Sequence, residues 1–535
     1  MGAMFANPVY RLTLPRRGPC DLSMTPPDAW PGNPDRGAAI VDNVFILAGT
    51  RVRAAGSPFD ETAPDPAWRD ALHEFTWLRD LRAHGGDAAR AYARTHVADW
   101  LTRHEHWSLP AWRADILGRR LAAWAAHYQA FFSAVPDLFR RRMLIGMARQ
   151  ARHLGRVAGR EVDGEARIAA IKGLVIAGLC IPGQDALLTR ALQLLEGELA
   201  RQIDVNGGHA GRSPARQLAL LCDLVDMRAA LSAGRQYTPP ALDDAIAKTA
   251  GMVRFFRHGD GGLANFNGGG ASGPVAIDRV LDMANARGRM PRQPIQHGFE
   301  RLVAGKLLVI ADTGIPAAPG FDSGAHAGTL SFEASFGKER LIVNCGAALA
   351  AGPQWRAAAR ATAAHSTLAL EDTNSSEIRD DGTLGHRPQT VNAEREEADG
   401  NIWLSLSHDG YAAAFGLIHH RRLYLAAKGD ELRGEDSLQP VPGSPDGRPK
   451  SRAYAIRFHI HPAVRLSLAQ DGATVFLRQA GGVGWRMRVG GARIDLAESI
   501  YFDGDEARRT QQIVLSGRTG ADATTVQWAL RREGA

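Results

Sequence analysis

The sequence predicts an α+β multidomain protein, in which a helical N-terminal part precedes a C-terminal antiparallel β-sandwich. From about residue 65 to residue 310, apolar residues return every three or four positions, which is the period of an amphipathic helix. From about residue 298 onward, short β-rich stretches alternate with turns, a pattern typical of an antiparallel sandwich. A chain of 535 residues has room for two or three domains. We expect a flexible tail at 1–35, a helical domain at 36–297 and a β-sandwich domain at 298–535.

Apolar stripes and prolines define the expected helices. The segment 68–82 places Trp68 and Leu72 on one stripe, and the segment 112–128 begins a second stripe at Trp112. Prolines stand near the starts or breaks of the helical segments, as the fixed φ of proline allows. Short loops predict a helical bundle, a solenoid or a toroid, and no strict repeat decides among them. Further helices are expected at 136–158, 165–180, 185–203, 213–232 and 239–256.

The expected strands are short runs bounded by turn residues. Glycine-rich segments lie on both sides of the change from helix to strand. Because ligands often bind where two domains meet, we expect a cleft between the helical and sheet domains. The strands are expected at 307–310, 329–336, 340–343, 366–370, 401–407, 421–425, 453–460, 473–477, 485–489 and 510–516.

The composition excludes several classes of protein. Hydrophobic residues make up 45% of the chain and charged residues 23%, which is usual for soluble globular proteins, so extensive disorder is not expected. Lys and Arg number 64 against 57 Asp and Glu, and the formal charge of +7 favours a polyanionic partner. The longest basic cluster, Arg140–Arg142, lies on an expected helix and no nucleic-acid-binding motif is visible, so we expect no nucleic-acid partner.

The chain shows no sequence signal for a membrane span, for export or for disulfide bonds. No run of about 18 apolar residues occurs, so no membrane span is expected. Basic residues near the N-terminus are followed by Gly18, Pro19 and Cys20, which interrupt any apolar signal segment. The four cysteines are far apart without CxxC spacing, so we expect buried thiols rather than zinc or redox chemistry.

Three polar segments contain the candidate site residues, and the first is 204–214. It ends in a Ser-Pro pair that fits a helix N-cap followed by the first helical residue. This structural explanation leaves Asn206, His209 and Arg212 as candidates for binding or catalysis. The alternative is that His209 and Arg212 are solvated surface groups on a loop.

The second segment, 255–270, is rich in glycine and contains His258, Asp260, Asn265 and Asn267. Its glycines let backbone approach a ligand closely, and the four polar side chains offer hydrogen-bond donors and acceptors. It is not a phosphate loop, because the Gly-Lys-Ser/Thr of that motif is absent. A flexible turn between domains is the structural alternative.

The third segment, 320–365, contains His326, Asn344 and His365 near the ends of expected strands. Imidazole and carbonyl oxygen both bind zinc, so these side chains could converge on a metal ion. Two histidines and one amide are nevertheless a poor set of zinc ligands.

In this order, the three segments resemble the heparinase II/III family of polysaccharide lyases. The helical part contributes Asp-x-x-Gly-Gly-His-x-x-Arg-Ser-Pro and Phe-Arg-His-Gly-Asp-Gly-Gly. The resemblance covers roughly residues 35 to 530 and implies an α/α toroid followed by an antiparallel β-sandwich. The sheet part resembles the family most, through His-Ala-x-x-Leu-Ser-Phe at His326, Leu-Ile-Val-Asn-Cys-Gly, Arg-x-Thr-x-x-His-Ser-Thr at Arg360, His408-Asp409-Gly410-Tyr411 and Arg457-Phe458-His459-Ile460-His461-Pro462.

The resemblance implies β-elimination at a uronic acid of an acidic polysaccharide. The C5 proton of a uronate is a very weak acid until its carboxylate is neutralised, so such a site needs a cation, a metal or a strong donor there. It also needs a base near C5 and an acid for the leaving oxygen, roles that His and Tyr usually fill. His209 matches the family's toroid-loop His or Asn, and His326, Asn344 and His365 match its structural zinc ligands.

The sequence departs from the family pattern at several of these positions. Gly324 and Gly328 replace the first His and the Asp of a His-x-His-x-Asp pattern, and Asn344 stands where a ligating Asp is usual, which weakens a possible structural zinc. Arg212 replaces a Glu and could pair with a substrate carboxylate through both guanidinium nitrogens. Because the second segment contains no tyrosine, His258 is the substitute candidate for the acid.

We therefore predict a polysaccharide lyase acting on an acidic polysaccharide, with His209, Arg212 and His258 as catalytic residues. The alternative is a catalytically silent protein that binds acidic glycans or takes part in envelope polysaccharide assembly. A hydrolase would need paired carboxylates, for which Asp204 and Asp260 are the obvious pair. The resemblance suggests the bacterial cell envelope or periplasm, and the lack of a visible signal peptide leaves the cytoplasm as the alternative. The expected substrate-binding residues are Asn206, Asp260, Asn265 and Asn267.

Overall fold

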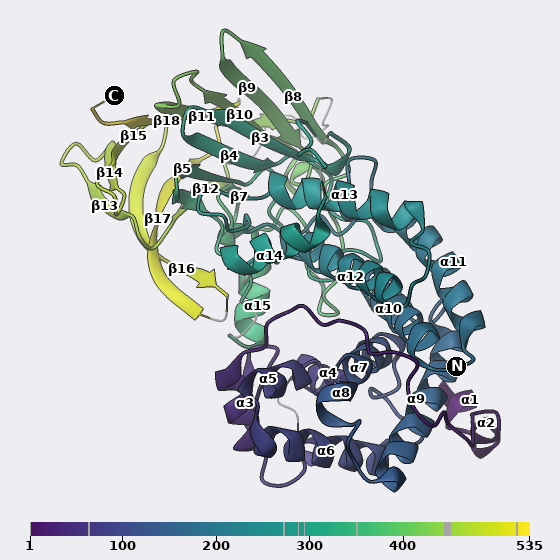
Figure 1. Ribbon diagram of the computed structural model, residues 1–535. Helices are drawn as coiled ribbons and strands as arrows, with labels where there is room; N and C mark the ends of the chain where they lie inside the picture. The colour runs from purple at the N-terminus through teal and green to yellow at the C-terminus, as the bar shows by residue number, and fades with distance from the viewer. Residues whose placement is uncertain are drawn as a thin grey trace. The chain divides into compact units, whose positions relative to one another are not determined.

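The chain folds as two compact units in the computed structural model (Figure 1). Unit 1 comprises Met1–Gln202 and Leu220–Ile246, and unit 2 comprises Ile203–Ala219 and Ala247–Ala535. Unit 2 therefore takes up helical segments that precede residue 298, and the domain boundary expected there stays a prediction. The structure describes residues 2–62, 65–270, 273–286, 288–293, 295–348, 351–442, 451–504, 506–520 and 523–534.

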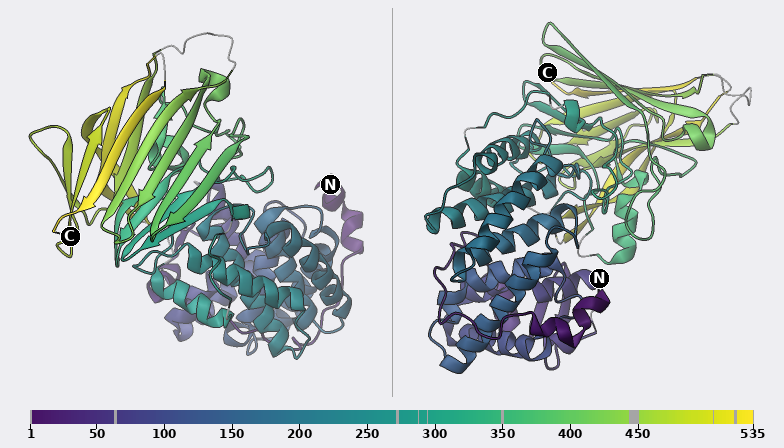
Figure 2. Two further views of the ribbon diagram at one scale, coloured as in Figure 1. Left: turned by 90° about the horizontal axis from the view of Figure 1, so that it is seen from above. Right: turned by 90° about the vertical axis from the view of Figure 1, so that its right-hand side faces the viewer.

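Unit 1 is mainly helical (Figures 1 and 2). A short hairpin of β1 (Val44–Leu47) and β2 (Thr50–Arg53) follows its third helix. Two further helices, α12 (Pro214–Ala233) and α13 (Pro240–Phe255), each belong partly to unit 1 and partly to unit 2. The helices that lie in unit 1 alone are α1 (Gly2–Ala6), α2 (Pro8–Leu12), α3 (Pro34–Val41), α4 (Pro66–Glu74), α5 (Leu78–His84), α6 (Gly86–Arg103), α7 (Ala114–Ala126), α8 (Tyr128–Phe131), α9 (Asp137–Val157), α10 (Gly164–Cys180) and α11 (Asp185–Gln202).

The helices expected from residue 136 onward agree with α9 to α13 within a few residues. The helix expected at 68–82 is interrupted instead. Phe75 adopts a left-handed conformation (φ 59°) that ends α4, and α5 starts three residues later. The apolar stripe continues across this break because Phe75 is itself fully buried, so periodicity alone could not reveal it.

The N-terminal segment packs onto unit 1 instead of forming the expected flexible tail. Phe5 and Leu14 are buried, and Tyr10 Oη lies 2.7 Å from His153 Nδ1 of α9. Further along this segment, the backbone N–H of Ser23 donates to the carbonyl oxygen of Cys180. A few apolar anchors thus order a segment whose composition resembles that of a loop.

Unit 2 contains two antiparallel sheets, which are eight-stranded within the described residues (Figure 2). The first sheet has the strand order β13-β14-β15-β18-β11-β10-β9-β8, and the second has the order β16-β17-β12-β6-β5-β4-β3, with β7 paired to β12. The helices of this unit are α14 (Pro274–Ala284), α15 (Pro353–Arg360) and α16 (Ala412–Phe415). The strands are β3 (Phe299–Ala304), β4 (Leu307–Asp312), β5 (Phe332–Phe336), β6 (Glu339–Val343), β7 (Leu368–Leu370), β8 (Val391–Ala398), β9 (Asn401–His408), β10 (Leu417–Leu425), β11 (Glu431–Pro440), β12 (Ala453–Ile460), β13 (Arg465–Leu468), β14 (Thr474–Arg478), β15 (Gly484–Gly490), β16 (Arg493–Asp503), β17 (Glu506–Arg518) and β18 (Thr524–Arg532).

The antiparallel sandwich expected from the sequence is confirmed, although six of its strands were not expected: β3, β8, β11, β13, β16 and β18. β8 is charged and largely exposed, and β11 carries an internal glycine and several acids, so neither has the composition of a typical strand. β16 and β18 alternate polar and apolar residues in part, and Gly491 and Gly520 precede them in the sequence, so a strand signal was present at both. Pairing with neighbouring strands thus outweighs local preference at β8 and β11.

A buried ion pair lies among the apolar side chains between the two sheets. Arg421 of β10 and Asp436 of β11 are cross-strand partners and have essentially no exposed surface. The Arg421 guanidinium donates to both Asp436 oxygens, at 2.7 and 3.2 Å, and its Nη1 donates to the carbonyl oxygens of Leu330 and Ser366. Burial alone would raise the pKa of Asp436, but Arg421 and the neighbouring His419 hold it below its ordinary value.

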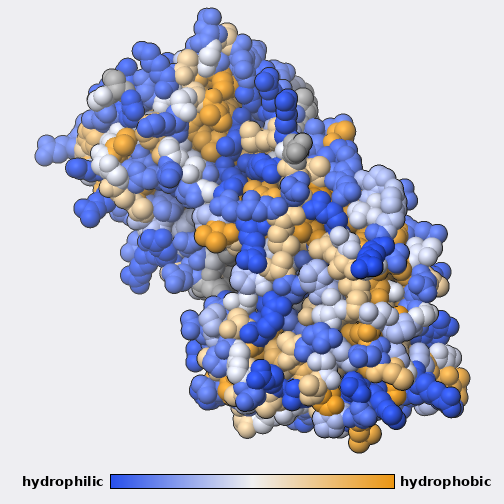
Figure 3. Space-filling view, viewed as in Figure 1, coloured by the Kyte–Doolittle hydropathy of each residue, from blue (hydrophilic) through white to orange (hydrophobic). Residues whose placement is uncertain are grey.

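The visible surface is mostly hydrophilic, with small apolar patches over both helices and strands (Figure 3). None of the helices in the described part of the chain is both long and apolar enough to cross a membrane.

We expect Asp436→Asn to lower the free energy of unfolding by about 3–5 kcal/mol, because it leaves the Arg421 charge buried without its counter-charge. Chemical denaturation of the full chain measures this, read from the transition that includes unit 2. Asp495→Asn is the matched control, because its carboxylate is 42% exposed and pairs with an exposed arginine. Equal stability of the two variants would contradict a structural role for the buried pair.

Candidate functional site

Three loops of unit 2 converge around Asn267 and bring together several of the predicted site residues. Asn267 Nδ2 donates to the carbonyl oxygen of Arg212 at 2.9 Å, and its Oδ1 accepts from the backbone N–H of His326 at 3.1 Å. Asn267 has a left-handed backbone (φ 46°), which asparagine adopts more readily than most residues. This asparagine, predicted to bind substrate, therefore joins the His209–Arg212 loop to the loop that carries His326.

His209 is fully buried in this loop junction. Its backbone N–H donates to Gln217 Oε1, and its Nδ1 accepts from the backbone N–H of Gly211 at 3.1 Å. Because Nδ1 accepts a hydrogen bond, the proton of the neutral ring is on Nε2. Burial, together with the charges of Arg216 and His297, lowers the pKa of His209 to about 3. His209 is therefore neutral at physiological pH.

Arg212 is held by internal partners. Its Nη2 donates to Asp312 Oδ1 at 2.6 Å and to the carbonyl oxygen of Gly298 at 2.7 Å. Further bonds run from Nε to the carbonyl oxygen of His297 and from Nη1 to that of Gly314. The catalytic role expected for Arg212 stays a prediction, but the geometry favours a residue that positions the loop.

Arg216 is a member of the cluster that the sequence did not reveal. It lies on the first turn of α12, and its guanidinium donates to the carbonyl oxygens of Phe321 and Ser323. A Cβ atom added at Gly324 would lie 3.0 Å from Arg216 Nη2, and Gly324 has φ +84°. Arg216 thus fills the space beside the position where the family pattern has its first histidine. Its spacing from His209, seven residues across a loop and a helix start, gives no sequence signal.

His326 and His365 are in direct contact. His365 Nδ1 donates to the carbonyl oxygen of Ala361 at 2.8 Å, so its Nε2 is unprotonated and accepts from His326 Nδ1 at 3.0 Å. His326 Nε2 consequently carries a lone pair. A Cβ atom at Gly328 would lie 2.7 Å from the His365 ring, so a larger residue at 328 would displace this histidine.

The residues predicted to bind zinc do not fit a zinc site. Asn344 Oδ1 accepts from the backbone N–H of Ser366 at 2.9 Å, and its Nδ2 donates to the carbonyl oxygen of Asn265 at 3.2 Å. The third expected ligand is thus engaged elsewhere, while His326 and His365 bond each other. Among the described residues, no group of three or more His, Cys, Asp or Glu side chains is arranged to hold a metal ion.

His258, in the loop after α13, belongs to a second buried network whose partners are on β5. Its Nε2 donates to Glu333 at 3.0 Å, and its Nδ1 lies 2.9 Å from Ser335 Oγ. Burial lowers the pKa of His258 below its ordinary value. Beside it, Arg340 holds Asp260 with an Nε to Oδ2 distance of 2.7 Å. The roles expected for His258 and Asp260 stay predictions, and both residues have internal partners.

The remaining predicted residues are placed differently. Asn206 is half-buried in the turn after Asp204, and its backbone N–H donates to that carboxylate. Asn265 is buried, and its backbone carbonyl oxygen accepts from Asn344 Nδ2. Asp204 contacts His297, with 3.0 Å between Oδ2 and Nδ1. Asp204 and Asp260, the pair considered for a hydrolase, are therefore each held by a different basic partner.

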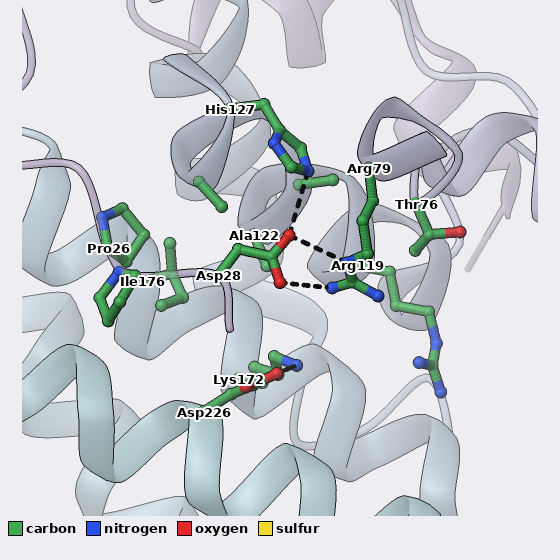
Figure 4. Close-up of a pocket in the computed structure, with 13 residues that line it drawn as sticks. Pro26, Asp28, Thr76, Arg79, Arg119, Ala122, His127, Lys172, Ile176 and Asp226 are labelled. Atoms are coloured by element: carbon green, nitrogen blue, oxygen red, sulfur yellow. Dashed lines mark hydrogen bonds and ion pairs between the residues drawn. The ribbon is translucent and has the colours of Figure 1, made fainter. Parts of the chain in front are cut away.

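Unit 1 contains a separate charged pocket (Figure 4). Asp28 accepts two hydrogen bonds from Arg79, both at 2.9 Å, and lies 3.4 Å from His127 Nε2. Lys172 lies between the carboxylates of Asp223 and Asp226. The space beside them is about 70 Å³, enough for a few waters but not for a sugar. Its cations neutralise carboxylates of the chain itself, so we do not place the functional site there.

The fold, the order of the three loops and the residues at their junction indicate one protein family. Residues 287–529 match the family model described as "Heparinase II/III-like, C-terminal". The chain belongs to the heparinase II/III family. Its helical part and antiparallel sandwich have the fold of heparinase III, a solved structure with a TM-score of 0.76 at 14% identity, covering 93% of this chain and 84% of that one.

Two further proteins are similar over nearly the whole chain. FtsZ-localized protein C of Caulobacter vibrioides (strain NA1000 / CB15N) is 34% identical over 554 residues, covering 99% of this chain and 93% of the relative. The structure of heparan sulfate lyase HepC from Pedobacter heparinus has a TM-score of 0.60 at 13% identity, covering 93% of this chain and 82% of that one.

We expect Arg212→Gln to destabilise the protein by about 3 kcal/mol, because it leaves Asp312 buried without its counter-charge. Denaturant unfolding of the full chain checks this. Arg493→Gln is the control, since Arg493 is 77% exposed and its surface ion pair contributes about 0–1 kcal/mol. A fully stable Arg212→Gln protein would instead support the direct substrate role.

Proposed function

We propose that this protein acts in cell division and binds an acidic, uronate-containing glycan without cleaving it. The observation that carries the proposal is the 34% identity, over 99% of the chain, to a protein named FtsZ-localized protein C. Identity at this level over the full length supports a shared cellular role. The similarity to solved lyases, at 13–14% identity, supports the shared fold.

Charge at the loop junction supports the binding of an anion. Arg216 donates to carbonyl oxygens of the 321–323 loop, and Arg360 donates to those of Ala325 and Gly382. Burial and the nearby Arg216 charge lower the pKa of Arg360 below its ordinary value. Two guanidinium groups that repel each other in this way would both be stabilised by a carboxylate placed between them.

The geometry of the predicted catalytic residues supports binding without cleavage. His209 has no exposed surface, and a residue with a pKa of about 3 is a weak base. Arg212 and His258 are engaged with Asp312 and Glu333. Where the family pattern has its first histidine, this chain has Gly324 with Arg216 beside it. The groups that would remove a C5 proton are therefore buried, engaged or absent from these positions.

The lone pair on His326 Nε2 favours a second candidate function, β-elimination. His326 is 6% exposed and lies near the charges of Arg216 and Arg360. In this reaction Nε2 takes the C5 proton, the C5–H electrons form the C4–C5 double bond, and the C4–O bond breaks. The proton then passes from His326 to the leaving oxygen, while Arg216 neutralises the substrate carboxylate.

Titration of acidic glycans into the protein should show binding that Arg216→Gln weakens by about tenfold or more, since a charge-assisted contact is lost. Calorimetry measures the affinity, and the ultraviolet absorbance of unsaturated uronate reports cleavage. We expect no product. Because His209 stays neutral, the affinity should change little between about pH 5 and pH 8. Arg493→Gln is the control and should bind like the unmodified protein.

Two results would change this proposal. Formation of unsaturated product that His326→Ala abolishes would favour the lyase instead. Affinity that rises as the pH falls below about 6.5 would show that a histidine cation, rather than Arg216, carries the binding.

A fluorescent fusion of the full chain should form a band that coincides with FtsZ and disperses when FtsZ is depleted. Fluorescence microscopy checks this, and fractionation of the same cells decides between the cytoplasm and the cell envelope or periplasm. The fluorescent protein alone is the control. A distribution that ignores FtsZ would contradict the cell-division role and leave the glycan-binding test unaffected.

A further inference from the structure

The outer face of the first sheet contains a hollow of about 600 Å³ that is separate in sequence and residues from the loop junction. The antiparallel register places one side chain from each of five adjacent strands in a row. Trp403 of β9 lies beside Tyr424 of β10, Tyr424 beside Arg433 of β11, and Arg433 beside Ala529 of β18, which is paired with Arg488 of β15. We name this face the sheet platform.

A second row runs parallel to the first across the platform. It contains Ser405, Arg422, Glu435, Gln527 and Gly490, again one residue from each strand in the same order. Alternation along each strand puts both rows on the face opposite the sandwich core. The small residues of the two rows are Ser405, Ala529 and Gly490. The hollow exists because they stand among much longer side chains.

The aromatic end of the platform is exposed and fixed in place. Trp403 is 38% exposed, although tryptophan is usually covered in folded proteins. The Trp403 and Tyr424 ring centres are 5.2 Å apart and the planes are tilted by 50°, so the two rings form an angled wall. Tyr424 Oη donates to Asn401 Oδ1 at 2.9 Å, which holds the tyrosine ring in this position.

The charged end of the platform has an excess of arginine. Glu431 pairs with Arg433 at 2.7 Å, and Glu435 accepts from Gln527 at 2.9 Å. Arg422 is 73% exposed and lies 3.9 Å from Glu435, a weak contact. With Arg488, also exposed, three arginines stand beside two glutamates at this end, whereas Glu394 and Glu396 of β8 are the cross-strand neighbours of Ser405 and Trp403 at the other end. An incoming anion would complement the arginine end.

We propose that the sheet platform binds an anionic oligosaccharide. A pyranose has an apolar C–H face and a polar rim, so one sugar fits its face against Trp403 while its hydroxyls meet Ser405. Gln527 lies three strands from Trp403, or about 14 Å at about 4.8 Å per strand, and would meet a later sugar of the same chain. The carboxylate or sulfate of the first sugar would pair with Arg422, one strand from Trp403, and that of a later sugar would pair with Arg488, four strands away. The exposed aromatic wall beside the arginines favours a sugar over a purely electrostatic ligand. This site goes beyond the proposed function, because it shares no residue with the Arg216 loop junction.

The test titrates hexameric oligogalacturonate into the full-length protein in an Arg216→Gln background, which removes the loop-junction contact. We expect Trp403→Ala to weaken the remaining binding by about tenfold or more and Arg488→Gln by about fivefold. Matched controls are Trp355→Ala, whose tryptophan in α15 is 48% exposed, and Arg493→Gln. Both should bind within twofold of the background protein. Hydrogen exchange should show protection of β9 and β10 only when the platform is intact.

Several results would contradict the proposal that the sheet platform binds an anionic oligosaccharide. Binding that survives Trp403→Ala unchanged in the Arg216→Gln background would do so, as would equal binding of an uncharged glucose hexamer. Capture of a single-stranded oligonucleotide that depends on Trp403, without any oligogalacturonate binding, would assign the face to nucleic acid. Loss of all binding in Arg216→Gln alone would leave the proposed function standing and remove the platform. If Trp403→Ala abolishes the binding seen with the wild-type protein and Arg216→Gln does not, the platform proposal stands and the glycan-binding part of the proposed function fails.

Discussion

The buried guanidinium of Arg421 connects the core of the first sheet to the segments that carry His326 and His365. Arg421 is neutralised by Asp436, and its remaining donor, Nη1, bonds the carbonyl oxygens of Leu330 and Ser366. Leu330 ends the loop that begins near His326, and Ser366 directly follows His365. An arginine charge so deep in the protein is stable only with all its partners present, so the segments carrying these two histidines cannot move independently of the sandwich.

Sequence reasoning predicted what depends on periodicity and motif order. Helices α9 to α13 and the antiparallel sandwich follow from apolar spacing, because burying one face of each element is what drives their packing. It did not reveal strands such as β8, whose side chains are mostly charged and whose partner supplies the pairing. The loops around His209, His258 and His326 were found as segments, but their partners were not. Each partner, as with Arg212 and Asp312, lies far away in the chain.

The overall positive charge of the sequence predicts a polyanionic partner, but the structure gives much of this charge a structural role. Of the 64 basic residues, 58 are arginines and 6 are lysines. The planar guanidinium donates to several oxygens at once, which suits it to tying loops and strands together. Arg120, Arg212 and Arg421 are all buried and each bonds two or more backbone carbonyl oxygens. Much of the cationic excess is thus structural, and a ligand preference has to be argued from the few arginines that remain near the surface.

The departures from the family motif are coupled through packing. Gly324 has φ +84°, a Cβ there would lie 3.0 Å from Arg216 Nη2, and a Cβ at Gly328 would lie 2.7 Å from the His365 ring. A histidine introduced at 324 would be strained by its backbone and would require the Arg216 guanidinium to shift, while an acid at 328 would displace His365 from His326. The two glycines, Arg216 and the His326–His365 contact therefore form one self-consistent arrangement. A His-x-His-x-Asp pattern at 324–328 would therefore require several simultaneous substitutions, because Arg216 and His365 occupy the neighbouring space.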